Sequence, residues 1–276
     1  MLIDYHLHNH LSPDSKTNTR DLVVCLQKLG IHNICITNHG EWFNIESSDH
    51  EEIFNFDEAF KRFSSIQKEI CEIRKEFPDM IIGFGAELQY RAKDLDDTLK
   101  FAKSLPFDFL LGSVHFVEDT LIANSKFAGD LFKNNDEHKI YTKYFKNVLE
   151  WVQLGIFDVV AHFDIIKKAG YEYYGPFKPE KYKPLIWKIL EEMKKRGIGM
   201  EVNTKCMFER CSEPFPHPDI LKWCVEVGIE NYTVGSDAHE IEEVGRGIPE
   251  AMEILKDVGV KKIATYKNRK VELVPL

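Results

Sequence analysis

The segment IIGFGAELQY, residues 81–90, is an apolar run that reaches a carboxylate, Glu87, near its end. Seven such runs occur along the chain, and in six of them His, Asp or Glu stands at the end of the run or within two positions of it. The other six are IDYHLH (3–8), ICITNHGE (34–41), FLLGSVHF (109–116), DVVAHFD (158–164), MEVNTK (200–205) and YTVGSDAH (232–239). Nearly continuous apolar runs are typical of parallel strands that are covered on both faces.

Helical patterns lie between these predicted strands, beginning with residues 19–30 and 56–78. Strict alternation of strand and helix indicates a parallel sheet. An open sheet of this width would spread its strand ends over about 30 Å, at about 4.8 Å per strand. Because potential ligands stand at most of these ends, we predict a closed fold. The expected fold is a distorted (β/α)7 TIM-like barrel, formed by residues 1–276 as a single domain, with a metal site at the C-terminal ends of the strands. Residues 261–276 are predicted to form two short strands that cap the barrel edge.

Composition limits the classes of function. The 276 residues are 43% hydrophobic and 12% aromatic, which predicts a globular protein with a sizeable core. The net charge of −9 and the interleaving of acidic and basic residues argue against a nucleic-acid partner. No signal peptide and no apolar run of membrane-spanning length is present, so we expect a cytoplasmic protein without a membrane partner. The six cysteines form no CxxC pair and are expected to be reduced. The oligomeric state stays open.

The polar residues at the strand ends have the composition of a transition-metal site. His6 and His8 are two residues apart, so a strand places both on one face. Imidazoles mixed with carboxylates suit Zn, Fe or Mn better than Mg or Ca. The potential ligands exceed what one tetrahedral ion needs, so two or three divalent ions are expected, with Glu87 as a bridge. Multinuclear sites activate water and stabilise charge at phosphorus. Our mechanistic hypothesis is therefore phosphate-ester hydrolysis by a metal-bridging hydroxide. The potential metal ligands at the strand ends are His6, His8, His39, Glu87, His115, His162, Asp237 and His239.

The motifs DYHLHNHLSPDS, ITNHGE, GAELQY, LGSVHF, AHFD, EVNTK and GSDAHE resemble, in order and spacing, those of the polymerase and histidinol phosphatase (PHP) superfamily. They look most similar to its histidinol-phosphate phosphatases. The resemblance implies a trinuclear site. The first ion would be held by His6, His8, Asp237 and a shared Glu87, and the second by Glu87, His115 and His162. The third would be held by His39, His239 and Asp14, at a position where many relatives have histidine.

The resemblance further implies hydrolysis of L-histidinol phosphate, a small phosphate monoester, to L-histidinol and phosphate in histidine biosynthesis. Glu41 is the expected partner of the cationic end of histidinol, and Lys167 and Arg210 are candidates for binding the phosphate. Asn203 is expected to face the site. Asp237 is also a candidate catalytic residue that handles a proton. The alternatives are a PHP-type protein-tyrosine phosphatase, another PHP phosphoesterase, or a metal-binding module without catalysis.

Overall fold

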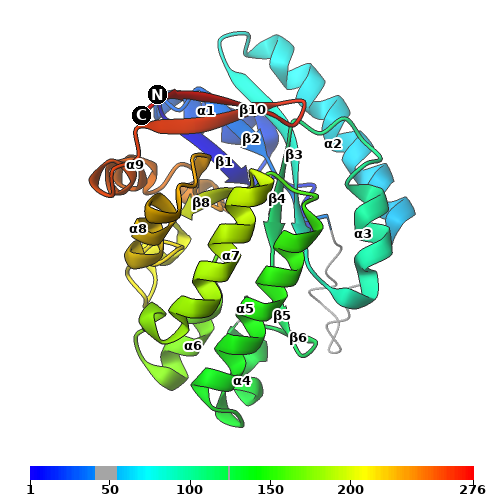
Figure 1. Cartoon of the computed structure of the whole chain (residues 1–276). Helices are drawn as coiled ribbons and strands as arrows, with labels where there is room; N and C mark the ends of the chain where they lie inside the picture. Colours follow the sequence, from blue (N-terminus) through cyan, green and yellow to red (C-terminus); the bar gives the residue numbers. More distant parts are fainter. Residues whose placement is uncertain (41–54, 124) are drawn as a thin grey trace.

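The computed structural model of the chain describes residues 1–40, 55–123 and 125–276. Seven parallel strands run through its centre in one sheet, with helices around the outside (Figure 1). In sheet order, they are β1 (Ile3–Leu7), β2 (Asn33–Ile36), β3 (Ile81–Gln89), β4 (Phe109–Ser113), β7 (Val159–Val160), β8 (Gly199–Asn203) and β9 (Tyr232–Gly235). The sheet order therefore follows the chain order.

The last strand returns to the first. Beyond the end of β9, the Asp237 amide donates to the carbonyl of His6 at 2.9 Å, and the His8 amide donates to the carbonyl of Ala238 at 3.1 Å. These bonds nearly close the sheet into a barrel, which confirms the predicted (β/α)7 TIM-like fold. The C-terminal ends of all seven strands consequently face the same mouth of the barrel.

Helices cover the outer face of the barrel. In α2 the buried residues Ala59, Phe63, Ile66, Ile70 and Ile73 recur at three- and four-residue spacing, as expected of a helix packed on a sheet. The α-helices are α1 (Thr19–Lys28), α2 (Phe56–Glu76), α3 (Leu95–Phe101), α4 (Ser125–Lys133), α5 (Glu137–Leu154), α6 (Ile166–Tyr174), α7 (Lys183–Arg196), α8 (Pro218–Val227) and α9 (Ile248–Asp257). Short 3-10 turns are η1 (Ala92–Asp94), η2 (Pro179–Tyr182), η3 (Lys205–Phe208) and η4 (Ile241–Glu243).

Two connections that follow strand ends contain regular structure. The long connection after His115 contains the hairpin β5 (Phe116–Val117) and β6 (Thr120–Leu121), followed by α4. The other contains α6, which begins four residues after His162. Both follow C-terminal strand ends, so they surround the mouth of the barrel that carries the potential ligands.

The C-terminal hairpin, β10 (Lys262–Lys267) and β11 (Lys270–Pro275), confirms the two predicted strands. It lies across the opposite mouth of the barrel, near the chain termini (Figure 1). The Tyr266 amide donates to the hydroxyl of Tyr5 at 3.2 Å, and the Asn268 amide donates to Asp108 Oδ1 at 3.1 Å. Since Asp108 directly precedes β4, the hairpin covers the N-terminal ends of the strands and leaves the ligand-bearing ends accessible.

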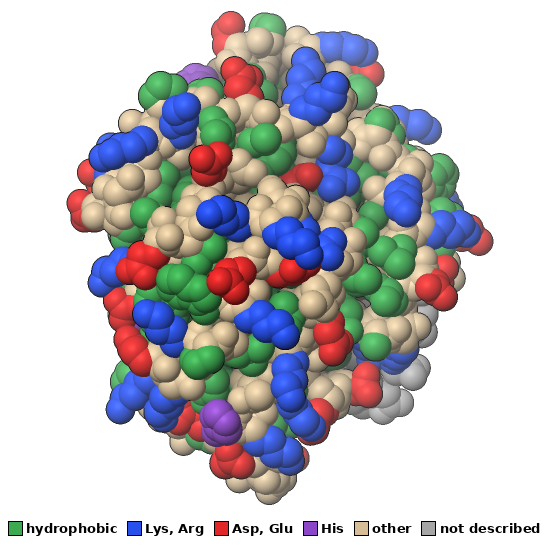
Figure 2. All heavy atoms as spheres, viewed as in Figure 1, with side chains coloured by type: hydrophobic (Ala, Val, Ile, Leu, Met, Phe, Trp, Pro, Cys, Tyr) green, Lys and Arg blue, Asp and Glu red, His purple; other side chains and the backbone are tan. Residues whose placement is uncertain are grey.

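The surface carries mixed charges on the face shown in Figure 2, where Lys and Arg side chains are interspersed with Asp and Glu. Within the described part of the chain, no helix is both long and apolar enough to cross a membrane.

Candidate metal centre

All nine predicted ligand side chains converge at the C-terminal ends of the strands. They form four overlapping groups, and within each group the potential ligand atoms lie within 4.8 Å of one another. The groups are His8, Asp14, His39 and His239; His6, His8 and Glu87; His6, His162 and Asp237; and His39, Glu87 and His115. The shared members connect the groups into a single cluster large enough for more than one ion.

The carboxylate of Glu87 lies at the centre of the cluster and is fully buried. Its Oε1 atom lies 2.9 Å from Nε2 of His162 and 3.2 Å from Nε2 of His115. Its Oε2 atom lies 3.0 Å from Nδ1 of His39 and 3.3 Å from Nε2 of His6. The two oxygens thus face different sets of imidazoles, so Glu87 could serve as a ligand for two ions at once.

The spacing of the donor atoms fits bound metal ions. At a Zn–N distance of about 2.0 Å, two ligands of a tetrahedral ion lie about 3.3 Å apart. The Nε2 atoms of His115 and His162 face each other at 3.3 Å. Among the described residues, buried Nε2 of His8 has no hydrogen-bond partner, although Asp237 Oδ1 lies 3.4 Å away. A buried ring nitrogen without a partner is costly, and a metal ion would satisfy it.

The electrostatics of the cluster also favour cations. Burial alone would lower the pKa of His6, but the carboxylates of Glu201, Asp237 and Glu87 raise it well above its ordinary value. Asp14 and Glu87 likewise outweigh burial and raise the pKa of His39. In turn, these imidazoles hold the pKa of Glu87 well below its usual range despite burial. Protons therefore occupy positions in the metal-free protein that metal ions can take.

His8 differs from these histidines. Burial and the nearby charges of His239 and His39 lower the pKa of His8 to about 3, so its ring is neutral at physiological pH. A neutral imidazole offers a lone pair directly to an ion. Its ring stacks on that of His239 at a centroid distance of 4.1 Å.

Asp14 completes the outermost group of donors. Its Oδ2 atom lies 3.0 Å from Nε2 of His239 and 3.2 Å from Nε2 of His39. Asp14 is therefore within reach of both imidazoles with which it was predicted to act. Its side chain is 27% exposed, compared with 1% for Glu87, so this part of the cluster is the most open to solvent.

Two of the potential ligands have strained backbones. Asp237 has φ +55° and His162 has φ +24°, in a region that side-chain-bearing residues rarely adopt. The Asp237 amide is held by the carbonyl of His6, and the His162 amide by the carboxylate of Glu201 at 2.7 Å. Such strain is typical of functional sites, where it aims a side chain at a common point.

Comparison with known proteins identifies the fold family. The model of the PHP domain matches residues 4–205. The chain belongs to the PHP domain family. A relative from Thermotoga maritima, named a probable histidinol-phosphatase, is 30% identical over 97% of this chain and all of its own length. The histidinol-phosphatase of Lactococcus lactis is 25% identical over 98% of this chain and 96% of its own.

A solved structure agrees with the observed fold. The crystal structure of a histidinol phosphate phosphatase from Lactococcus lactis, complexed with zinc, L-histidinol and phosphate, superposes with a TM-score of 0.83. It covers 98% of each chain at 24% identity. The likeness supports the barrel architecture of this PHP domain over its full length.

The PHP centre includes residues that the sequence analysis missed. Glu201 lies with Oε1 2.7 Å from Nδ1 of His6, and Gln89 lies with Oε1 3.0 Å from Nδ1 of His115. Glu201 lies two positions before the predicted Asn203 on β8, and Gln89 lies two positions after the predicted Glu87 on β3. Residues two apart share a face of a strand, so this spacing was the signal that could have found them.

Asn203 faces the centre as expected. Its Nδ2 atom lies 3.3 Å from Asp237 Oδ2 and 3.4 Å from His6 Nδ1. The next residue but one, Lys205, was not predicted: its ammonium donates to the Asp237 carbonyl at 3.1 Å and to Glu243 at 2.6 Å. Glu243 also accepts a hydrogen bond from the His239 amide. The ion pair between Lys205 and Glu243 therefore holds the segment that carries Asp237 and His239.

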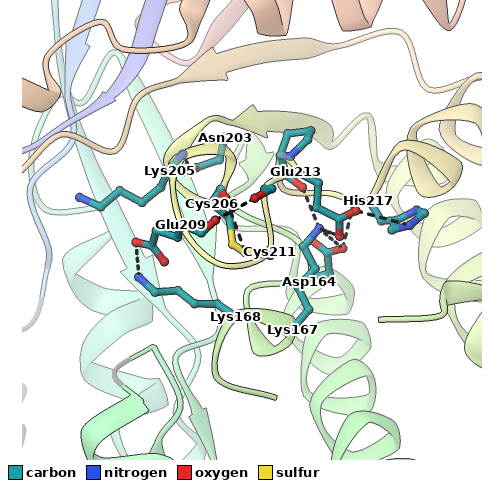
Figure 3. Close-up of a disulfide and its surroundings, with 12 residues drawn as sticks. Asp164, Lys167, Lys168, Asn203, Lys205, Cys206, Glu209, Cys211, Glu213 and His217 are labelled. Atoms are coloured by element: carbon teal, nitrogen blue, oxygen red, sulfur yellow. Dashed lines mark hydrogen bonds and ion pairs between the residues drawn. A yellow bond between two sulfur atoms is a disulfide. The ribbon is translucent and has the colours of Figure 1, made fainter. Parts of the chain in front are cut away.

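The structure argues against Lys167 as a phosphate ligand. Its ammonium is buried and lies 2.7 Å from the Pro214 carbonyl, 3.0 Å from Glu213 and 3.1 Å from Asp164. Figure 3 shows Lys167 directed toward Asp164 and Glu213, away from Lys168, which binds Glu209. Three oxygens match the three N–H donors of an ammonium group. Lys167 therefore fastens the loop before α8 onto α6.

Arg210, in contrast, is exposed on this loop, between η3 and α8. Glu41 lies outside the described residues, so its role remains a prediction.

The expectation that all cysteines are reduced was wrong for one pair. Cys206 and Cys211 form a disulfide within the loop that follows β8 (Figure 3). The η3 turn brings their Cα atoms to 5.9 Å, although the sequence shows no recognised pairing motif. The free cysteines among the described residues are Cys25, Cys35, Cys71 and Cys224.

Proposed function

We propose that this PHP domain protein is a metal-dependent phosphatase that hydrolyses L-histidinol phosphate to L-histidinol and phosphate. The proposal depends above all on the convergence of six imidazoles and three carboxylates at one mouth of the barrel. It is supported by relatives named histidinol-phosphatase that match nearly the whole chain.

The donor set fits two or three divalent ions, with zinc, iron and manganese as the suitable metals. Glu87 would be shared between two ions, one held with His6, His8 and Asp237 and the other with His115 and His162, and its contacts with His6, His115 and His162 support this arrangement. Asp14, His39 and His239 would hold a further ion. When bound, such ions lower the pKa of a coordinated water and neutralise charge on the phosphoryl oxygens.

The residues around the donors bind and orient the substrate. Arg210 lies exposed on the loop after β8, where a guanidinium can form a bidentate contact with phosphate. Asn203 orients Asp237, which also handles a proton during the reaction. Glu41 remains the predicted partner of the cationic end of histidinol.

A substrate panel tests the proposal. Phosphate release is measured with the zinc-loaded protein on L-histidinol phosphate, tyrosine phosphate and p-nitrophenyl phosphate under identical conditions. We expect kcat/KM to be at least about 100-fold higher for histidinol phosphate, because a site that pairs with its cationic end rejects esters that lack one. Equal or higher kcat/KM for tyrosine phosphate would favour the phosphatase class that acts on proteins.

A further inference from the structure

Glu201 is a buried carboxylate that belongs to none of the groups of potential metal ligands. It lies on β8, pointing into the barrel, and its side chain is 1% exposed. Its polar contacts within the described residues are with His6, the His162 amide and Asn203, and none is with Lys or Arg. Burying a carboxylate without a lysine or arginine is costly, so its position requires an explanation in terms of the groups it contacts.

Its two oxygens connect three separate parts of the centre. Oε1 lies 2.7 Å from Nδ1 of His6, on β1. Oε2 accepts a hydrogen bond from the His162 amide at 2.7 Å and another from Asn203 Nδ2 at 3.2 Å. His6 and His162 share one group of potential ligands with Asp237, which Asn203 also contacts. One side chain thus holds two of these ligands directly and the third through Asn203.

The packing around Glu201 is adapted to its contact with His6. A Cβ atom at Gly235, on the neighbouring strand β9, would overlap both Oε1 of Glu201 and Cβ of His6. Glycine at this position therefore allows the carboxylate and the imidazole to approach. The absence of a side chain at Gly235 on β9 is a second observation, separate from the hydrogen bonds of Glu201, that points to the close contact between Glu201 and His6.

We propose that Glu201 is a positioning residue for the metal centre. Its Oε1 accepts the Nδ1 proton of His6, which fixes the ring in the tautomer whose Nε2 lone pair points toward Glu87 and Asp237. A carboxylate behind a ligating histidine also increases the basicity of that histidine. Through the His162 amide, Glu201 additionally holds the strained turn that presents the second imidazole. The inference rests on the proposed metal centre and is independent of which phosphate ester is the substrate.

Zinc affinity tests this role without an activity assay. Competition with a chromophoric chelator is measured for the wild type, Glu201→Gln and Glu201→Asp, together with thermal unfolding of each metal-free protein. Glu192→Gln, the same chemical change on a surface helix, is the control. We expect Glu201→Gln to bind zinc about 10- to 100-fold more weakly. The unfolding temperature of the metal-free Gln variant separates a loss of zinc affinity from a loss of folded protein, because Glu201 also makes buried contacts with His6 and the His162 amide.

Unchanged zinc affinity in Glu201→Gln would overturn the inference, and so would a loss confined to the stability of the metal-free protein. If the Gln variant does not fold, Glu201→Asp carries the same test, because the shorter carboxylate cannot reach His6 and the His162 amide together. A wild type that binds no zinc would overturn the metal centre itself, which distinguishes that failure from the failure of Glu201 alone.

Discussion

His115 and His162, 47 residues apart in sequence, place their Nε2 atoms 3.3 Å from each other beside one oxygen of Glu87. Two neutral imidazoles gain little from such a contact unless a proton or a metal ion lies between their lone pairs. Together with Glu87, the pair offers three donor atoms that a single metal ion would fit.

Replacing His162 by Ala should remove one ion and the reaction with it. We expect the metal content to fall by about one ion per chain. Hydrolysis should fall by more than about 100-fold, since even supporting residues of metal sites typically cost 10- to 100-fold. Elemental analysis and phosphate release check both quantities. His138→Ala, on the exposed face of α5, is the matched control. A His162→Ala protein with full metal content and wild-type turnover contradicts the assignment.

The ion beside Asp14 should be the first to dissociate, because Asp14 is the most exposed of the three carboxylates, Asp14, Glu87 and Asp237. During timed dialysis against a chelator, we expect the metal content to fall in steps and the Asp14→Ala protein to lack the first step. The exposed Asp21 on α1 provides the control, Asp21→Ala, which should retain all steps. Identical chelation profiles for wild type and Asp14→Ala would show that Asp14 binds no ion.

Metal binding should release protons at neutral pH. The raised pKa values of His6 and His39 mean that both rings are protonated in the metal-free protein, so an ion must displace those protons. Metal affinity should consequently fall as the pH decreases. Calorimetric titration with zinc at pH 7, in buffers of different ionisation enthalpy, measures the number of protons released. A heat of binding that is independent of the buffer would contradict this reasoning.

Arg210 and Lys167 should respond differently to substitution. We expect Arg210→Ala to raise KM for histidinol phosphate about tenfold, the effect of losing about 1.4 kcal/mol of binding, with unchanged metal content. Lys167→Met should instead lower the unfolding temperature, because it leaves the buried Asp164 without its cation. Steady-state kinetics and thermal unfolding of both variants separate the two roles. A larger KM effect for Lys167→Met, at unchanged stability, would reverse the two assignments.

The sequence predicted the barrel and eight of the nine potential ligands from local patterns, and the resemblance to the PHP superfamily added Asp14. Apolar runs define the strands, and the residues at their ends must meet once the sheet closes. Glu87 illustrates this: its position at the end of a strand was enough to place it in the centre. The same argument applies to His6 and His8, whose two-residue spacing fixed their common face.

The supporting residues were harder to predict, because their roles depend on distances between strands. Glu201 is an ordinary strand residue until β1 and β9 lie beside it. Lys167 follows a strand end, as a phosphate-binding lysine would, but the loop before α8 folds over it and takes its donors. Cys206 and Cys211 gave no signal, because only the η3 turn brings them together.

The most direct test of the account combines elemental analysis with turnover on one preparation. Protein stripped by a chelator and then reloaded with zinc should contain two or three ions per chain, and its histidinol-phosphate hydrolysis should rise from background in proportion to the metal restored. Full turnover by the stripped protein, or less than one ion per chain after reloading, would contradict the proposed multinuclear phosphatase.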